Sequence, residues 1–165
     1  MNVSLEKFLS ERRSAIVAKW FEKTIEVFPQ DTSPFLRNRE SRFRNPLGHT
    51  LSKGIEGLFD ELLSGGGDHE KLSSILDTII RINAVQEIPP SQAVAFIFSL
   101  KNVIREDLKK EIREERLYDE LSAFESGIDA MALLSFDLYM KCREKIYDLR
   151  VKELKQWGLR PVESR

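Results

Sequence analysis

The fold of this chain is decided by residues 113–157, which read REERLYDELSAFESGIDAMALLSFDLYMKCREKIYDLRVKELKQW and contain no proline and one interior glycine, Gly127. Apolar positions alternate by four and three, the spacing that keeps one seam of a helix against a partner helix. After Cys142 the alternation is shifted once, because the next step is again four, to Ile146, and the apolar series then continues. The seam comprises Leu117, Leu121, Phe124, Ile128, Met131, Ser135, Leu138, Cys142, Ile146, Leu149, Leu154 and Trp157. Because Gly158 and Pro161 follow, we predict one long helix that ends there.

The rest of the chain also has helical spacing of its apolar residues, and it has no strand-like alternation and no hairpin signal. The fold class predicted is all-α, a bundle of several helices with a long C-terminal helix. We expect one domain, residues 1–157, followed by a tail at residues 158–165. The other predicted elements are a helix at 5–28, a short helical turn at 33–36, helices that begin at Asn45-Pro46, at Asp68 and at Ser91 or Gln92, and a bend at 110–115.

Composition restricts the class of function. Lysine and arginine total 26 against 27 aspartates and glutamates, and this net charge of −1 argues against nucleic acid as a partner. The one cysteine, Cys142, excludes an internal disulfide and fits a reducing cytoplasm. We expect a cytoplasmic chain without membrane insertion, because no signal peptide and no run long enough to span a bilayer is present.

Four arginines follow the short helical turn, and two interpretations of them are open. The segment is either a solvated linker held to the core by Phe35, Leu36 and Phe43, or a site for an anion or an acidic partner. The second interpretation rests on the guanidinium group, which pairs well with carboxylates and phosphates. The candidate ligand or partner contacts are Arg37, Arg39, Arg42 and Arg44, together with His49, which follows this run.

The two histidines offer little for metal chemistry. Neither His49 nor His69 has a histidine or cysteine three or four positions away, the spacing that metal ligands on one helix need. A packed or capping residue is the simplest interpretation of His49, and a haem ligand in an α-helical sensor is the alternative. We predict no cofactor, no metal and no catalytic residue, because the acidic residues at 111–120 lack Glu-x-x-His repeats and no nucleophile motif occurs.

The centre of the long helix, residues 133–140, is apolar around most of its circumference. We expect this part to be covered on two sides, as a core helix of the bundle. Residues 142–157 are more amphipathic and are expected to form an arm that pairs with a copy of itself or contacts the next module. A patch of small side chains, which would let another helix approach closely within the chain or across a dimer, comprises Ala123, Ser126, Gly127 and Ala130.

Two further stretches carry a family resemblance: residues 42–51, RFRNPLGHTL, and residues 88–101, IPPSQAVAFIFSLK. Together with the helical start and the long last helix, they resemble the N-terminal domain family of the RsbT co-antagonist (RsbRD) proteins, which are regulators of bacterial stressosomes and kinases. The resemblance covers nearly the whole chain. It implies a globin-like helical fold without haem, and no enzymatic residues.

The resemblance also implies a domain that senses a signal and passes it through its last helix to a kinase or a STAS-type protein. Since no output domain precedes Arg165, we expect either a stand-alone form that acts in trans or an isolated domain. The alternative function is a haem- or small-ligand-binding globin-like sensor with His49 as the ligand. The favoured interpretation is a non-catalytic sensory domain, a homodimer through Leu138, Cys142, Ile146, Leu149, Leu154 and Trp157.

Overall fold

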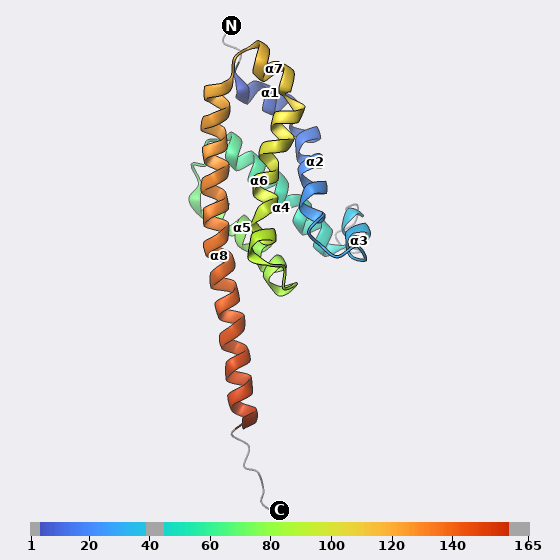
Figure 1. Cartoon of the computed structure of the whole chain (residues 1–165), viewed down its shortest axis with the longest axis vertical. Coiled ribbons are helices and arrows are strands. Elements are labelled where there is room, and N and C mark those ends of the chain that lie inside the picture. Colours follow the sequence, from blue (N-terminus) through green and yellow to red (C-terminus); the bar gives the residue numbers. More distant parts are fainter. Residues whose placement is uncertain (1–3, 39–44, 159–165) are drawn as a thin grey trace, which may run out of the picture.

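The longest element is α8, Tyr118–Gly158, which runs the length of the molecule and extends beyond every other helix (Figure 1). The computed structural model describes residues 4–38 and 45–158. Within these residues the only regular elements are helices, so the all-α class and the long C-terminal helix are confirmed. The other helices are α1 (Leu5–Glu11), α2 (Arg13–Ile25), α3 (Ser33–Arg37), α4 (Pro46–Leu63), α5 (His69–Val85), α6 (Pro90–Asp107) and α7 (Lys109–Glu114).

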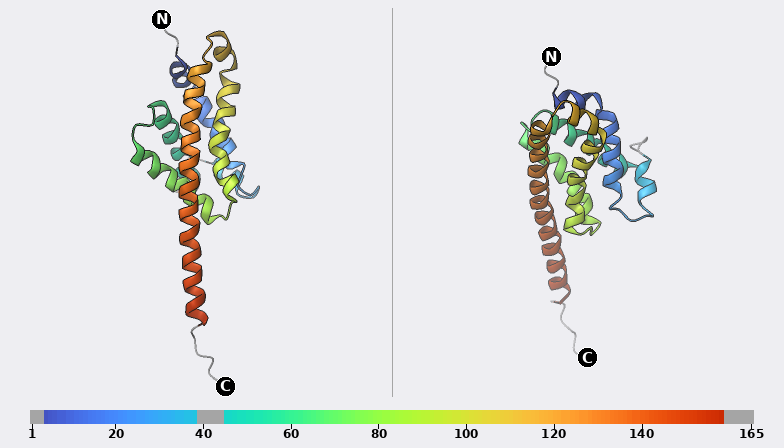
Figure 2. Two further views of the ribbon diagram at one scale, coloured as in Figure 1. Left: turned by 60° about the vertical axis from the view of Figure 1, so that its left-hand side comes forward. Right: turned by 45° about the horizontal axis from the view of Figure 1, so that its top comes forward.

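Helix α8 packs mainly against α6 and α5, and α2 packs against α6. In the left view of Figure 2, α8 lies in front, with the connection from α4 to α5 on one side of it and α6 with α2 on the other. The fully buried Trp20 of α2 stacks on Phe96 of α6, with ring centroids 6.3 Å apart, and donates its indole N–H to the Phe96 carbonyl at 2.7 Å. The core therefore lies around α6, and α8 forms one wall of it.

The predicted helix starts are confirmed by their caps. The side chains of Ser4, Asn45 and Asp68 each accept a hydrogen bond from the backbone N–H three residues further on. Gly48, in the first turn of α4, has a packing role, because a Cβ there would lie 2.6 Å from the carbonyl oxygen of Leu36. This close approach positions the short helix α3 against α4.

The predicted helix at residues 5–28 is interrupted at Arg12 and ends at Ile25. Arg12 leaves the helical conformation, with a φ of −103° and a ψ of 13°. Its guanidinium group donates to the carbonyl of Asp107 and pairs with Glu111 of α7, so it connects the junction of α1 and α2 to the junction of α6 and α7, at the same end of the bundle (Figure 1). Two smaller corrections are that α6 begins at Pro90 and that Phe35, expected to hold its segment to the core, is exposed.

The last helix begins at Tyr118, later than residue 113, where the uninterrupted pattern starts. The predicted bend is a separate helix, α7, followed by a tight turn. Arg116 lies in the left-handed region with a φ of 54°, and the N–H of Leu117 donates to the carbonyl of Ile112 at 3.0 Å. This is the hydrogen bond of a Schellman motif, which ends α7 and reverses the chain into α8.

Candidate functional site

The α5–α6 turn, residues 84–88, holds α8 at the place where α8 leaves the bundle. Three side chains of α8 contact this turn, and we call these contacts the α5–α6 clamp. Because they are spread over about three turns of α8, the clamp fixes both the position and the direction of the helix. The three contacts are the Tyr139 hydroxyl to the Ile88 carbonyl at 2.5 Å, Arg143 to the Ala84 carbonyl at 3.2 Å, and Arg150 to the Glu87 carboxylate at 2.7 Å.

Glu87 has an unusual backbone conformation for its residue type. Its φ of 57° lies in the left-handed region, and the N–H of Ile88 donates to the carbonyl of Asn83 at 3.2 Å, which closes a Schellman motif at the end of α5. The equivalent position after α4 is Gly65, with a φ of 83°. A glutamate in the glycine position brings a carboxylate to Arg150. The hydrogen bond from Arg150 lowers the pKa of Glu87 below its ordinary value.

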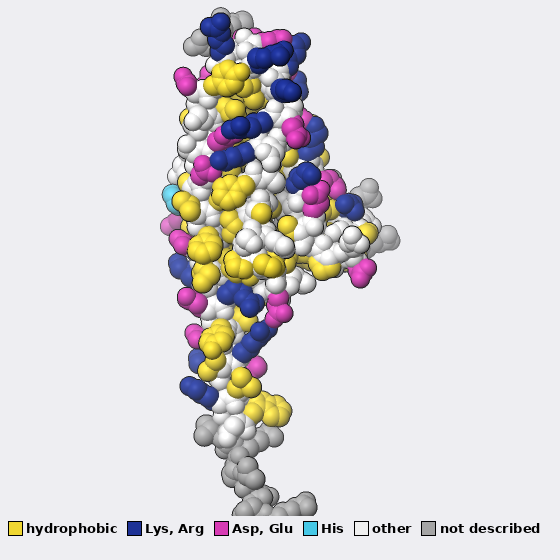
Figure 3. All heavy atoms as spheres, viewed as in Figure 1, with side chains coloured by type: hydrophobic (Ala, Val, Ile, Leu, Met, Phe, Trp, Pro, Cys, Tyr) yellow, Lys and Arg dark blue, Asp and Glu magenta, His cyan; other side chains and the backbone are white. Residues whose placement is uncertain are grey.

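Large apolar side chains lie exposed along one side of α8. Leu133 and Leu154 are 70% and 72% exposed. The expectation that residues 133–140 are covered on two sides is wrong: α5 and α6 cover one side of α8, and the other carries hydrophobic side chains at the surface (Figure 3). Five side chains recur within about 60° of one another around the helix axis, and we call them the exposed stripe. They are Leu133, Phe136, Met140, Tyr147 and Leu154.

The residues predicted for the dimer and signalling helix divide into two groups. Leu138, Cys142 and Ile146 are half-buried and pack against the core of their own chain. Leu149, Leu154 and Trp157 are exposed, the first on a side of the helix away from the exposed stripe. Contact of either group with a second copy stays a prediction.

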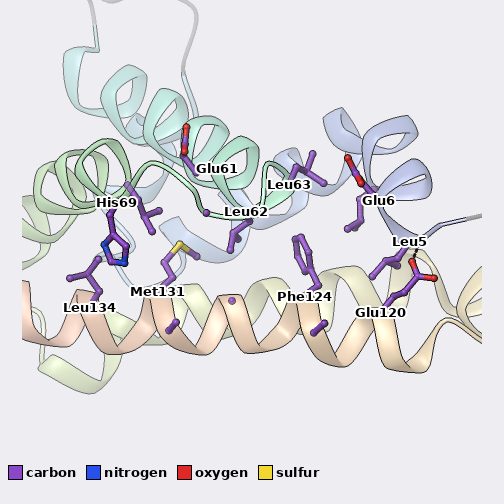
Figure 4. A pocket seen from close by; sticks show the side chains of 17 residues that line it. Leu5, Glu6, Glu61, Leu62, Leu63, His69, Glu120, Phe124, Met131 and Leu134 are labelled. Carbon is purple, nitrogen blue, oxygen red and sulfur yellow. Dashed lines mark hydrogen bonds between the residues drawn. The ribbon is translucent and has the colours of Figure 1, made fainter.

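A cavity of about 480 Å³ lies between the first half of α8 and the connection from α4 to α5, and we call it the α4–α8 cavity. Figure 4 shows Leu62, Phe124 and Met131 in its centre. At one end, Glu120 of α8 accepts the backbone N–H of Leu5 at 2.7 Å, which connects α1 to α8. The volume is within the range of sites that bind small molecules, about 300–1,000 Å³.

The predicted patch of small side chains forms one wall of this cavity. Ala123, Gly127 and Ala130 line it, and a Cβ on Gly127 would lie 3.5 Å from the nearest atom of Leu62, an ordinary contact distance. We expected these residues to let another helix approach closely. The structure has a cavity there instead, because α8 packs mainly on α5 and α6 and leaves space on the side of α4.

The predicted ligand contacts do not meet at the cavity. Arg37 pairs with Glu22 at 2.9 Å on the surface, and Arg39, Arg42 and Arg44 lie outside the described residues. His49 is half-buried in the first turn of α4 and does not line the cavity. The haem alternative stays a prediction.

Neither a metal-binding group nor a membrane-spanning helix occurs among the described residues. Between residues 4 and 38 and between 45 and 158, no group of three or more His, Cys, Asp or Glu side chains is placed to hold a metal ion. None of the helices in the same ranges is both long and apolar enough to cross a membrane.

The sequence analysis predicted neither the α5–α6 clamp nor the α4–α8 cavity. Glu87 and Arg150 are far apart in the chain, and no local pattern connects them. A signal existed for Glu87, since α5 had to end before Pro89 without a glycine. A signal also existed for the cavity, because Ala123, Gly127 and Ala130 recur by four and three beside a seam of bulky residues.

Known proteins resemble this chain in sequence. The family model described as "RsbT co-antagonist protein rsbRD N-terminal domain" matches residues 14–154, a range that contains all residues of the α5–α6 clamp. An uncharacterized protein of Archaeoglobus fulgidus is 30% identical over 105 residues, which cover 62% of this chain and 66% of that protein. No solved structure matches the chain.

Proposed function

The chain belongs to the RsbT co-antagonist RsbRD N-terminal domain family, and from this premise we propose that it is a non-catalytic sensory domain whose last helix passes a signal to a partner. The family is one of regulatory domains of stressosome systems. We propose that residues 1–157 form the sensory unit, that it acts in the cytoplasm, and that its partner is a kinase or a STAS-type protein contacted in trans. A globin-like arrangement of the bundle is part of the same proposal.

The observation that carries this proposal is the continuity of α8. One helix of 41 residues lines the α4–α8 cavity, passes through the α5–α6 clamp and extends beyond the bundle to Gly158. A helix without a break moves as a unit over this distance. A change in packing at the cavity would therefore alter the position of the far end, which is a known type of switching transition.

The far end of α8 supports contact with another helix. Most of the stability of a helix in a protein comes from the packing of its apolar face. Residues 140–158, which we call the exit segment, have little of the bundle beside them (Figure 1). The exposed stripe continues along the exit segment through Tyr147 and Leu154. We propose that the exit segments of two copies pack together, with Leu149 and Trp157 as further contacts.

Light scattering on the full chain tests the homodimer. We expect the mass of a dimer, and the mass of a monomer for Leu154→Asp, because a buried carboxylate would face an apolar partner surface. Gln156→Asp is the matched control, since it adds the same single negative charge at an exposed position of the exit segment on a side of α8 away from the stripe. A monomer mass for the unchanged chain would contradict the homodimer.

A kinase assay tests the regulatory role. We expect the full chain to change the rate at which an RsbT-type kinase phosphorylates a STAS-type substrate, and we expect Leu154→Asp to lose this effect. An unchanged rate at saturating concentrations of the chain would exclude these partners. An absorption scan with added haem tests the alternative, because a Soret band that is lost in His49→Ala would favour the haem sensor.

A further inference from the structure

We propose that the α4–α8 cavity binds a long-chain alkyl cation, with the apolar chain along α8 and the positive head group beside Glu6 and Glu120. The inference deepens the proposed function by naming a class of ligand. Only the effect of the ligand on α8 rests on that function. Binding itself rests on the shape, lining and charge of the cavity.

The shape and lining of the cavity fit an elongated apolar group. The cavity follows α8 from Glu120 to Leu134, which is four turns of helix, or about 21 Å at 1.5 Å per residue. Leu62, Phe124 and Met131 lie along its middle (Figure 4). Each methylene group that moves from water into such surroundings contributes favourably to binding.

The charges at one end of the cavity determine the sign of the head group. Three carboxylates line the cavity, and no lysine or arginine does. Glu61 pairs with Lys71. Within the described ranges, no lysine or arginine pairs with either of the other two, Glu6 and Glu120, which lie at the same end as Leu5 (Figure 4). An ammonium group there gains charge-assisted contacts, whereas a carboxylate or phosphate group meets charges of its own sign.

The cavity can be entered without unfolding of the bundle. Ala123 and Ala130 line it and are exposed, and Gly127 between them is half-buried. On the other side, Gly65 and Gly66 form part of the rim, and a Cβ on either would meet no atom within 4 Å. Small side chains on both edges thus leave an opening beside α8.

Calorimetric titration of the full chain tests the proposal with dodecyltrimethylammonium as the probe, used below its micelle concentration. Dodecanoate is the matched anion, with an alkyl chain of nearly the same length. We expect saturable binding of one cation per chain, and binding of dodecanoate at least about tenfold weaker, the difference expected for a head group next to two carboxylates near the surface.

Two sets of variants locate the head group and the chain. The double variant Glu6→Gln with Glu120→Gln keeps the shape of both residues and the acceptor for the Leu5 N–H, and we expect it to bind the cation about tenfold more weakly. Gly127→Leu should place a bulky side chain across the middle of the cavity, block the path of the alkyl chain and abolish binding. Gly127→Ala is its control, because the added methyl group meets Leu62 at an ordinary distance and leaves most of the space open.

Each outcome decides a different point. Absence of saturable binding overturns the site, equal binding of dodecanoate overturns the cation, and unchanged binding by the double glutamine variant overturns the position of the head group. A change in oligomeric mass in Gly127→Leu would show that a second copy occupies the cavity, and would also overturn the proposal. If Gly127→Leu does not fold by circular dichroism, the surface variants at Glu6 and Glu120 still decide. Binding without any change in kinase regulation would contradict the proposed function and leave the ligand site intact.

Discussion

The apolar pattern of α8 continues, after one shift, through both halves of the helix, but the bundle surrounds the first half and solvent surrounds most of the second. In residues 118–139 the seam is buried or half-buried, and Ile128 and Ser135 are fully enclosed by the bundle. In the exit segment, Leu154 and Trp157 continue the apolar pattern on exposed positions. The boundary between the halves is the α5–α6 clamp.

The difference shows that periodicity reports which residues can be buried and not what buries them. The first half of α8 has α5 and α6 beside it, whereas the exit segment continues past the turn that joins these two helices (Figure 2). The exposed apolar side chains of the exit segment, Leu154 among them, are therefore the observation on which the proposed contact with a second helix rests. The predictions below test this contrast, beginning with the largest effect.

Truncation of the seam should destabilise the chain only in the packed half. Ile128→Ala is expected to lower the free energy of unfolding by about 3 kcal/mol, because it leaves a cavity in a fully buried site. Urea denaturation followed by circular dichroism measures the change. The matched truncation in the exit segment is Leu154→Ala, which we expect to change stability by less than about 0.5 kcal/mol at concentrations where the chain is monomeric. Equal effects at the two sites would mean that the exit segment is packed in the monomer.

The hydroxyl at the boundary should contribute less than a core side chain. Tyr139→Phe removes the donor to the buried carbonyl of Ile88 and is expected to cost about 1 kcal/mol, the usual net value of such a hydrogen bond. Tyr147→Phe is the control in the exit segment, where the side chain is exposed and no change is expected. Thermal unfolding of both variants gives the comparison. A Tyr139→Phe variant as stable as the unchanged chain would remove the hydroxyl from the clamp.

Much of the bundle, including the packed half of α8, could be predicted from sequence, because the local signals and the tertiary environment agree there. Caps such as Asn45 and Asp68 act within one turn, and the alternation of four and three continues from Leu117 to Cys142. The family resemblance came from two local stretches, and the family match confirms it. The sequence predicted only a bend at residues 110–115, and it did not predict that α7 is a separate helix there.

The candidate site could not be predicted, because it depends on contacts between distant residues. Arg12 falls inside a helical pattern, and only its contact with Asp107 explains the break there. Small residues at 123, 127 and 130 fit a close helix contact as well as a cavity, and the packing of α8 on other helices decides between them. No local pattern connects Glu87 with Arg150, although the end of α5 before Pro89 draws attention to Glu87.

Two helix ends of the same geometry should both be more stable with glycine at the left-handed position, so removing a glycine from one and introducing a glycine at the other should change stability in opposite directions. Gly65→Ala is expected to lower the stability of the bundle by about 1 kcal/mol, because alanine must adopt a φ of 83°. Glu87→Gly should raise the urea midpoint slightly, since it relieves the left-handed glutamate. It should also lower the hydrogen-exchange protection of α8 around Arg150, because the clamp loses a contact. Unchanged protection there would mean that Arg150 does not hold the exit segment.

The smallest expected effect is the acid titration of the clamp. The pKa of Glu87 in the folded chain lies below its ordinary value of 4.5, chiefly because Arg150 donates a hydrogen bond to the carboxylate. A carboxyl group whose pKa is lower in the folded state stabilises that state fully above pH 4.5, and it loses this contribution as the pH falls through the lowered pKa. NMR titration of the Glu87 carboxyl carbon should therefore give a midpoint below 4.5, and Arg150→Gln should return it towards 4.5.

Arg143→Gln is the control, and it should move the midpoint less, because Arg143 acts on Glu87 only through its charge and as the weakest of the influences that shift this pKa. If the Arg143 variant moved the midpoint more than the Arg150 variant did, the exit segment would be held by a different residue from the one that the clamp assigns, and the boundary between the two halves of α8 would lie closer to the core.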